Sequence, residues 1–204
     1  MPDRQRAHFI NSLSGFKSAN LIATQDVNGQ TNLAIFSSVV HLGASPALVG
    51  FIMRPDNNDR HTLDNISINK HYTINQVSRD FYEKAHQTSA RYPRQQSEFD
   101  EVGLSTFHLD SINAPFVKES RLKYAVTLKE IVPIPLNNTL FIIGEISDVI
   151  CDKEAIKDDG YIDIQSLQTV SVSGLDSYHT SQRLSRLSYA KPNIIPHHLN
   201  NKLK

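Results

Sequence analysis

The side chains best suited to bind a ligand are hydroxyl groups and arginines that follow one another within a short stretch of the chain. Ser37 and Ser38 interrupt an apolar strand, and Arg54 directly follows a second strand. Arg60 and Thr62 then stand at the start of a short helix, where free N–H groups and a positive potential favour an anion. Guanidinium and hydroxyl groups donate hydrogen bonds that suit phosphate oxygens. The pattern therefore predicts a site for the phosphate of a flat aromatic cofactor.

Two hairpins and a short helix must position these groups. Residues 20–27 and 31–41 are predicted strands, and Asn28-Gly29 between them is a strong short signal for a hairpin turn. A further strand is predicted at 47–53, and a helix at 60–68. Because a helix this short is not stable in isolation, it must pack against the strands.

The rest of the chain adds more short strands than helices. We predict a helix at 79–90 capped by Ser78, a helical turn at 97–103, and strands at 71–77, 104–109, 115–118, 121–134, 139–151 and, in short pieces, 161–173. Many short strands without βαβ alternation favour a mainly β fold, either an antiparallel barrel or a sandwich. We treat residues 1–204 as one domain, with a core at about 15–190 and a polar C-terminal arm at 190–204.

The composition limits the partners. With 21 Lys and Arg against 21 Asp and Glu, the 204-residue chain has no formal net charge. This balance argues against nucleic acid or an anionic membrane as a partner, and it does not oppose self-association. The 39% of hydrophobic residues is typical of a globular protein with a core. No stretch resembles a signal peptide or a membrane span, and Cys151 is the single cysteine, so we expect a cytoplasmic protein.

Motifs for several other chemistries are absent from the sequence. There is no GxGxxG and no GxxxxGK[ST], so a Rossmann or P-loop nucleotide site is not supported. The nine histidines show no HxxxH or HExxH spacing, so we expect no metal site. No GxSxG surrounds Ser37, so we do not expect it to act as an acyl nucleophile.

Several short blocks, taken in order, resemble the flavin reductase-like family of FMN-binding split barrels. They are Phe36-Ser37-Ser38, residues 45–51 and 60–66, Tyr92-Pro93, and residues 97–104, 115–120 and 143–146. The family commonly has Lys-Asp-Thr where this chain has Arg60-His61-Thr62, so the cation and the hydroxyl persist while the Asp does not. The pattern that we associate with nicotinamide contact in the short reductases is not found in residues 173–186.

The resemblance implies an FMN-binding split β-barrel of Greek-key type that acts as a homodimeric oxidoreductase. The implied reaction is hydride transfer from NAD(P)H to the flavin, which requires no side-chain acid, base or nucleophile, so we assign no catalytic residue. The implied cofactor-binding residues are Phe36, Ser37, Ser38, Arg54, Arg60, His61, Thr62 and Tyr92. Two alternatives stay open: a non-catalytic FMN-binding protein or electron carrier, and an all-β protein that binds no flavin.

Several of these residues also have a purely structural interpretation. The two serines can be ordinary strand residues, Phe36 can belong to the core, and Tyr92 can pack at a helix end. The acidic residues Glu98, Asp100 and Glu101 are expected to form a solvated cluster at the end of a helix.

Overall fold

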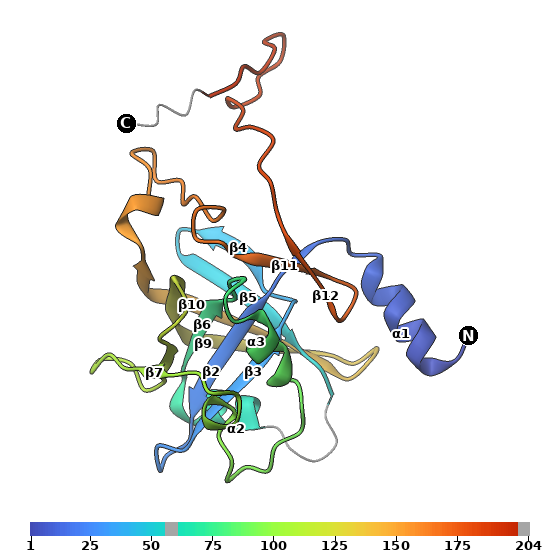
Figure 1. Ribbon diagram of the computed structural model, residues 1–204, viewed down its shortest axis with the longest axis vertical. Coiled ribbons are helices and arrows are strands. Elements are labelled where there is room, and N and C mark those ends of the chain that lie inside the picture. The colour runs from blue at the N-terminus through green and yellow to red at the C-terminus, as the bar shows by residue number, and fades with distance from the viewer. Residues whose placement is uncertain (56–60, 200–204) are drawn as a thin grey trace.

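The computed structural model of the protein describes residues 1–55 and 61–199, and it centres on one sheet of seven antiparallel strands (Figure 1). The strands are β2 (Asn20–Gln25), β3 (Thr31–Phe36), β4 (Val40–Ala44), β5 (Ala47–Met53), β6 (His71–Gln76), β9 (Leu122–Ile134) and β10 (Thr139–Cys151). Their order across the sheet is β3-β2-β6-β9-β10-β5-β4.

The two edges of this sheet are joined by a very short piece of chain. β3 and β4 lie at opposite edges, although only Ser37, Ser38 and Val39 separate them in the sequence. The sheet must therefore curl until its edges approach each other, and no hydrogen-bonded ladder joins β3 to β4 in the described ranges. The predicted single strand over 31–41 is wrong because the chain bends at the serines to change edges. The outcome is a mainly β split barrel, as the resemblance implies, and of the two architectures that the strand pattern left open it is the barrel.

Large apolar side chains fill the inside of the curled sheet. They include Ile22, Phe51, Tyr72, Ile74, Val126 and Ile142, all of them buried. The ring centroids of Phe36 and Phe51 lie 5.0 Å apart, and those of Phe51 and Tyr72 lie 5.7 Å apart. Gly144 of β10 completes this packing, because a Cβ at that position would lie 2.5 Å from the Tyr72 hydroxyl. The interior is thus a packed core.

A second apolar cluster lies on the outer face of β2 and β3. Leu21 and Ala23 of β2 point into it, whereas Ile22 between them points into the barrel, as the two-residue period of a strand requires. Two short helices, α3 (Tyr82–Gln87) and α4 (Glu98–Val102), cover this cluster, with Phe99 of α4 fully inside it.

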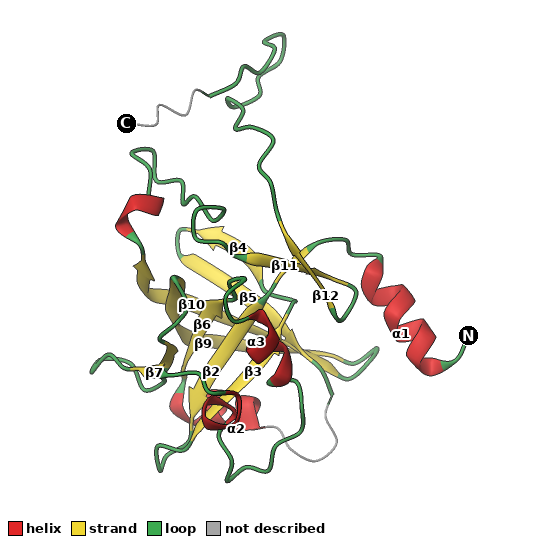
Figure 2. Cartoon of the chain, in the orientation of Figure 1, coloured by secondary structure: helices red, strands yellow, loops and turns green. Residues whose placement is uncertain are grey.

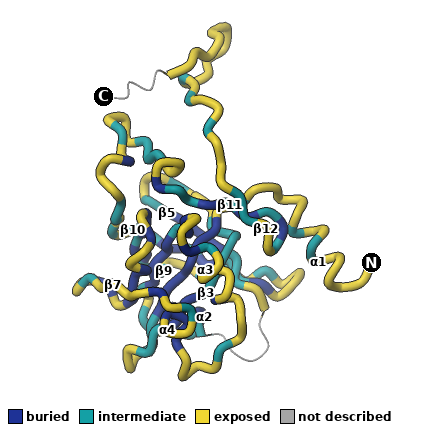
Figure 3. Tube along the Cα trace, in the orientation of Figure 1, coloured by how far each residue is buried: buried dark blue, intermediate teal, exposed yellow. Residues whose placement is uncertain are grey.

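The remaining elements surround the barrel (Figure 2). α2 (His61–Asn69) contacts β2 and β3, and η1 (Lys153–Ala155) follows β10. β1 (Lys17–Ser18), β11 (Val170–Ser173) and β12 (Ser177–Thr180) form a three-stranded sheet, and β7 (Thr106–Phe107) pairs with β8 (Phe116–Val117). α1 (Asp3–Ser12) and residues 181–199 stand away from the body and are mostly exposed (Figures 1 and 3). Within the described residues, no helix is long and apolar enough to cross a membrane.

The structure confirms some predicted elements and corrects others. The long strands predicted at 121–134 and 139–151 agree with β9 and β10 to within one residue. The helix predicted at 79–90 is wrong in extent, because Val77 and Arg79 form backbone hydrogen bonds with Val170 and Gln168 that keep this segment extended. Ser78 accordingly pairs with Thr169 in a β-bridge and does not cap the helix. The sequence analysis also missed α1 and β12.

Candidate functional site

A small open pocket lies at the N-terminal end of α2. The turn between β2 and β3 forms one wall, and the loop that precedes α4 forms another. The lining residues are Asp26, Gln30, Thr31, Asn32, His61, Asn65, Arg94 and Gln96. The turn is held in shape by Asp26, whose carboxylate accepts hydrogen bonds from the backbone N–H groups of Asn28 and Gln30 at 2.8 and 2.9 Å. Gly29 completes the predicted hairpin turn with a positive φ of 83°.

Behind the pocket lies a buried network of amides and hydroxyls. The Asn32 Nδ2 group donates a hydrogen bond to Thr62 Oγ1 at 2.9 Å, and the Asn65 Nδ2 group donates one to Thr24 Oγ1 at 3.0 Å. All four residues are buried. Thr62 Oγ1 accepts from Asn32, and a hydroxyl that accepts a hydrogen bond can still donate one, because it has one donor hydrogen and two acceptor lone pairs. The Asn65 Oδ1 atom is also buried and makes no hydrogen bond with the described part of the chain.

The start of α2 adds a favourable environment for an anion. The first N–H groups of a helix have no partner within the helix, and the aligned peptide dipoles place a positive potential there. α2 is nine residues long and begins at His61, with Thr62 as its second residue. The Thr62 hydroxyl and the helix start therefore belong to the same turn, which suits a phosphate or carboxylate.

The two serines of the predicted site lie in the bend between β3 and β4. Ser38 Oγ accepts a hydrogen bond from Ile52 N at 3.1 Å and donates one to Ile52 O at 3.2 Å. Its hydroxyl thus fastens the bend to β5, at the point where the two edges of the sheet meet. Ser37 is half-buried, and its hydroxyl makes no hydrogen bond within residues 1–55 and 61–199. Phe36, directly before it, packs in the barrel core against Phe51.

Arg54 lies at the end of β5 and contacts the N-terminal helix. Its guanidinium donates a hydrogen bond to Asn11 Oδ1 of α1 at 2.9 Å. Lys17 lies nearby, and its ammonium donates to the carbonyls of Asn11 and Gly174 at 2.8 and 3.0 Å. Burial, with a smaller contribution from the Arg54 charge, lowers the pKa of Lys17. In the described ranges no hydrogen bond joins Arg54 to the start of α2.

The other predicted site residues have different positions. Arg60 lies outside the described residues, and His61 lines the pocket. Tyr92 lies on the loop after α3, where its hydroxyl accepts a hydrogen bond from Gln87 Nε2 at 3.0 Å. Two residues further on, Arg94 lines the pocket and forms an ion pair with Asp64 of α2 at 2.6 Å. The structure therefore brings Arg94 to the site, and the sequence analysis did not select it.

Glu98 corrects the expectation of a solvated acidic cluster. Its side chain is only 7% exposed, and Oε2 accepts a hydrogen bond from the backbone N–H of Leu33 at 2.8 Å. Burial raises the pKa of Glu98, although the Leu33 hydrogen bond and the nearby His61 act in the opposite direction. Asp100 and Glu101 are exposed, as predicted. Glu98 is buried because β3 is an edge strand, and the outward N–H groups of β3 need an acceptor.

The donors around the pocket fit an anionic ligand. They are the Thr62 hydroxyl, the first N–H groups of α2 and the Arg94 guanidinium at the rim. Among the described residues, no group of His, Cys, Asp and Glu could hold a metal ion. Thr24, Asn32 and Asn65 were missed by the sequence analysis; the spacing of Asn65 three residues after Thr62, on the same helix face, was the signal that could have found it.

The chain is similar to several known proteins in sequence and in structure. Residues 13–166 match the family model of the flavin reductase like domain. The solved structure of a proposed flavin reductase with a split barrel domain from Shewanella frigidimarina NCIMB 400 is 57% identical, covers 93% of this chain and 94% of its own, and has a TM-score of 0.90.

Two more distant proteins are also similar. Nitrilotriacetate monooxygenase component B from Bacillus cereus is 16% identical, covers 92% of this chain and 95% of its own, and has a TM-score of 0.81. At that identity the likeness shows the fold alone. An uncharacterized protein of Aquifex aeolicus strain VF5 is 26% identical over 137 residues, which are 65% of this chain and 70% of its own.

Proposed function

The chain belongs to the flavin reductase-like family and is a flavin-related oxidoreductase, and we propose that its flavin is FMN, bound with the phosphate at the N-terminal end of α2. The observation that carries the proposal is the arrangement of Thr62. Its hydroxyl oxygen accepts a hydrogen bond from Asn32, which holds the hydroxyl at the start of a helix, where it can also donate to a ligand. A phosphate monoester presents several strong acceptor oxygens and about two negative charges to such a donor set.

The shape of the pocket favours a terminal phosphate. The β2–β3 turn and the loop that carries Arg94 stand on either side of the α2 start, and the Arg94–Asp64 ion pair holds that loop against the helix. In FMN the phosphate is the end of the molecule. We propose that Arg54, together with Ser37 and the bend around it, contacts other parts of the same ligand. The roles of Phe36, Ser38, Arg60 and Tyr92 at the flavin stay predictions from the resemblance.

The proposed reaction is reduction of the flavin by NAD(P)H. A bound flavin supplies the hydride acceptor, and the protein supplies binding, orientation and electrostatics. The groups proposed to face the phosphate are hydrogen-bond donors and the Arg94 cation, which suit binding. The one carboxylate among the described lining residues, that of Asp26, accepts the N–H groups of Asn28 and Gln30, so no side-chain proton transfer is assigned. We further propose that the working unit is a homodimer.

Calorimetry with FMN, FAD and riboflavin tests the phosphate site. We expect FMN to bind more tightly than either of the other two, because riboflavin lacks the phosphate and FAD extends beyond it. Equal affinity for FMN and riboflavin would show that α2 contributes no phosphate site. If no flavin binds at micromolar concentration, the flavin proposal itself is overturned.

A further inference from the structure

Residues 181–199 form an arm that stands away from the body of the molecule (Figure 1). We call residues 181–199 the arm. Leu184, Tyr189 and Ile195 are 99%, 88% and 89% exposed. Such side chains on one projecting segment have no cover from the chain's own body, and Figure 3 shows the arm as mostly exposed.

The arm nevertheless has a defined local structure. Leu187 pairs with His198 in an antiparallel bridge, and Ser188 N donates a hydrogen bond to His197 O at 2.9 Å. Leu199 N donates to the carbonyl of Arg186 at 2.8 Å. The outer part of the arm is therefore a small hairpin that satisfies part of its backbone internally while its apolar side chains face solvent.

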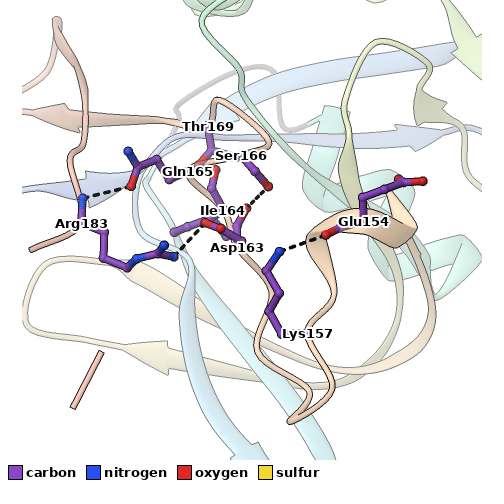
Figure 4. Close-up of polar contacts among 8 residues, drawn as sticks. All are labelled: Glu154, Lys157, Asp163, Ile164, Gln165, Ser166, Thr169 and Arg183. Atoms are coloured by element: carbon purple, nitrogen blue, oxygen red, sulfur yellow. Dashed lines mark hydrogen bonds and ion pairs between the residues drawn. The ribbon is translucent and has the colours of Figure 1, made fainter. Parts of the chain in front are cut away.

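Specific polar contacts fix the base of the arm. The Arg183 guanidinium forms an ion pair with Asp163 at 3.1 Å, and its backbone N–H donates to Gln165 Oε1 at 3.1 Å (Figure 4). Arg186 pairs with Asp159, and its guanidinium lies 4.1 Å from the centre of the Tyr161 ring. These contacts hold the base of the arm against residues 159–165 of the body.

Opposite charges are concentrated in the C-terminal residues and in the part of the body that holds the arm. The arm has no Asp or Glu, and its three cations are Arg183, Arg186 and Lys191; Lys202 and Lys204 follow it in the sequence. Residues 145–163, which we call the acidic segment, contain seven Asp and Glu and two Lys. In the sequence, residues 181–204 thus have a formal charge of +5 and the acidic segment −5, and because the whole chain has no net charge, the remainder is balanced. The two parts are complementary in charge.

The arm's own body neutralises only part of this charge. Arg183 and Arg186 use Asp163 and Asp159, whereas Lys191 further out forms no ion pair in the described part of the chain. On the acidic segment, Asp148, Glu154 and Asp158 likewise form no ion pair with described residues, and the segment exposes the apolar side chains of Val149 and Ile156. A surface with both charges and apolar groups suited to the outer arm is therefore present on every copy.

We propose that the arm of one copy docks on the acidic segment of a second copy of this chain, and that the exchange is reciprocal. A two-fold arrangement lets the same pair of surfaces form twice, so both arms and both acidic segments are covered. A nucleic acid or an anionic membrane is disfavoured as the occupant, because residues 1–180 carry a formal charge of −5 that would oppose it. The arm also lies beyond residues 13–166, which match the family. The inference gives a surface to the homodimer proposed above and does not depend on flavin.

The test compares full-length variants by sedimentation equilibrium. One variant carries Leu184→Ser, Tyr189→Ser and Ile195→Ser on the arm. The control carries Val27→Ser and Leu136→Ser, which are 70% and 98% exposed at two hairpin turns of the body. We expect the wild type to have twice the 23.0 kDa mass of the chain at micromolar concentration. The arm variant should have a dimer dissociation constant raised about tenfold or more, because apolar contact area is lost, while the control stays near the wild type.

A second comparison tests the charge complementarity. Lys191→Glu should weaken the dimer, and raising the salt concentration from about 0.1 M to about 0.5 M should weaken the wild-type dimer, since exposed charge pairs are screened. Equal dissociation constants for the arm variant and the control would overturn the inference while leaving a homodimer through another surface. A monomeric wild type that sediments with anionic vesicles would overturn it in favour of a membrane. A dimer that the arm variant weakens and the control does not, in a protein that binds no flavin, would support the arm exchange and contradict only the FMN proposal.

Discussion

At the scale of single residues, the candidate site depends on Thr62, whose hydroxyl oxygen accepts a hydrogen bond from Asn32. Replacing Thr62 with Val removes the hydroxyl hydrogen at the start of α2. We expect FMN affinity to fall about tenfold to a hundredfold, the range for one hydrogen bond to a charged group. Calorimetry of Thr62→Val and of Thr62→Ser, which keeps the hydroxyl, measures the effect.

Riboflavin provides the internal control for this experiment. Because the Thr62 donor is assigned to the phosphate, Thr62→Val should bind riboflavin as the wild type does. An equal loss for FMN and riboflavin would point to a general distortion of the site, and unchanged FMN binding would remove Thr62 from it.

Gly144 gives a prediction about the barrel interior. A Cβ at this position would lie 2.5 Å from the Tyr72 hydroxyl and 3.0 Å from the Thr127 carbonyl. We expect Gly144→Ala to lower the free energy of unfolding by about 1–3 kcal/mol, as other overpacked cores do. Urea unfolding checks this. Gly43→Ala is the matched control, because its Cβ would make only an ordinary contact of 3.4 Å with Pro46 O. Equal stability of both variants would show that the core yields easily.

At the scale of elements, α4 protects the open edge of the barrel through Glu98. Its carboxylate accepts the outward N–H of Leu33, and Ser97 lies beside it with its hydroxyl 2.6 Å from that of Thr31. An edge strand without such cover offers its N–H groups to other chains. The cost is a buried carboxyl group whose pKa is raised by burial above its ordinary value of 4.5.

The pH dependence of stability follows from that shift. Since the pKa of Glu98 is higher in the folded chain than in the unfolded chain, ionisation favours unfolding. The stability of the wild type relative to Glu98→Gln should therefore fall as the pH rises from about 4.5 through the folded pKa, and then level off. Urea titrations of both proteins across this window measure the difference. Parallel stability profiles would show that Glu98 does not titrate differently in the two states.

At the scale of the whole molecule, the proposed activity requires that flavin and nicotinamide meet on one protein. Under nitrogen, NADH or NADPH should bleach the absorbance of bound FMN, and air should restore it. Stopped-flow absorbance follows the reaction. If dithionite reduces the flavin but neither nicotinamide does so within minutes, the reductase proposal is wrong and a non-catalytic flavin carrier takes its place.

The sequence by itself determined the local parts of this protein. Hydrophobic alternation and turn residues predicted β5, β9 and β10 closely, because these signals act between neighbours in the chain. The order of short blocks indicated the family that the comparison shows. The opposite charges of residues 181–204 and of the acidic segment are likewise present in the sequence, but the sequence alone does not show which surfaces carry them.

The tertiary structure decided whatever depends on partners distant in the chain. Glu98 is buried because β3 happens to be an edge strand, and the helix expected from Ser78 onward is shortened because residues 168–170 bind that segment. The Thr62 hydroxyl is held at the start of α2 by a hydrogen bond from Asn32, thirty positions earlier in the chain. Burial and hydrogen-bond partners are properties of the packed chain, so no local pattern of residue types could have specified them.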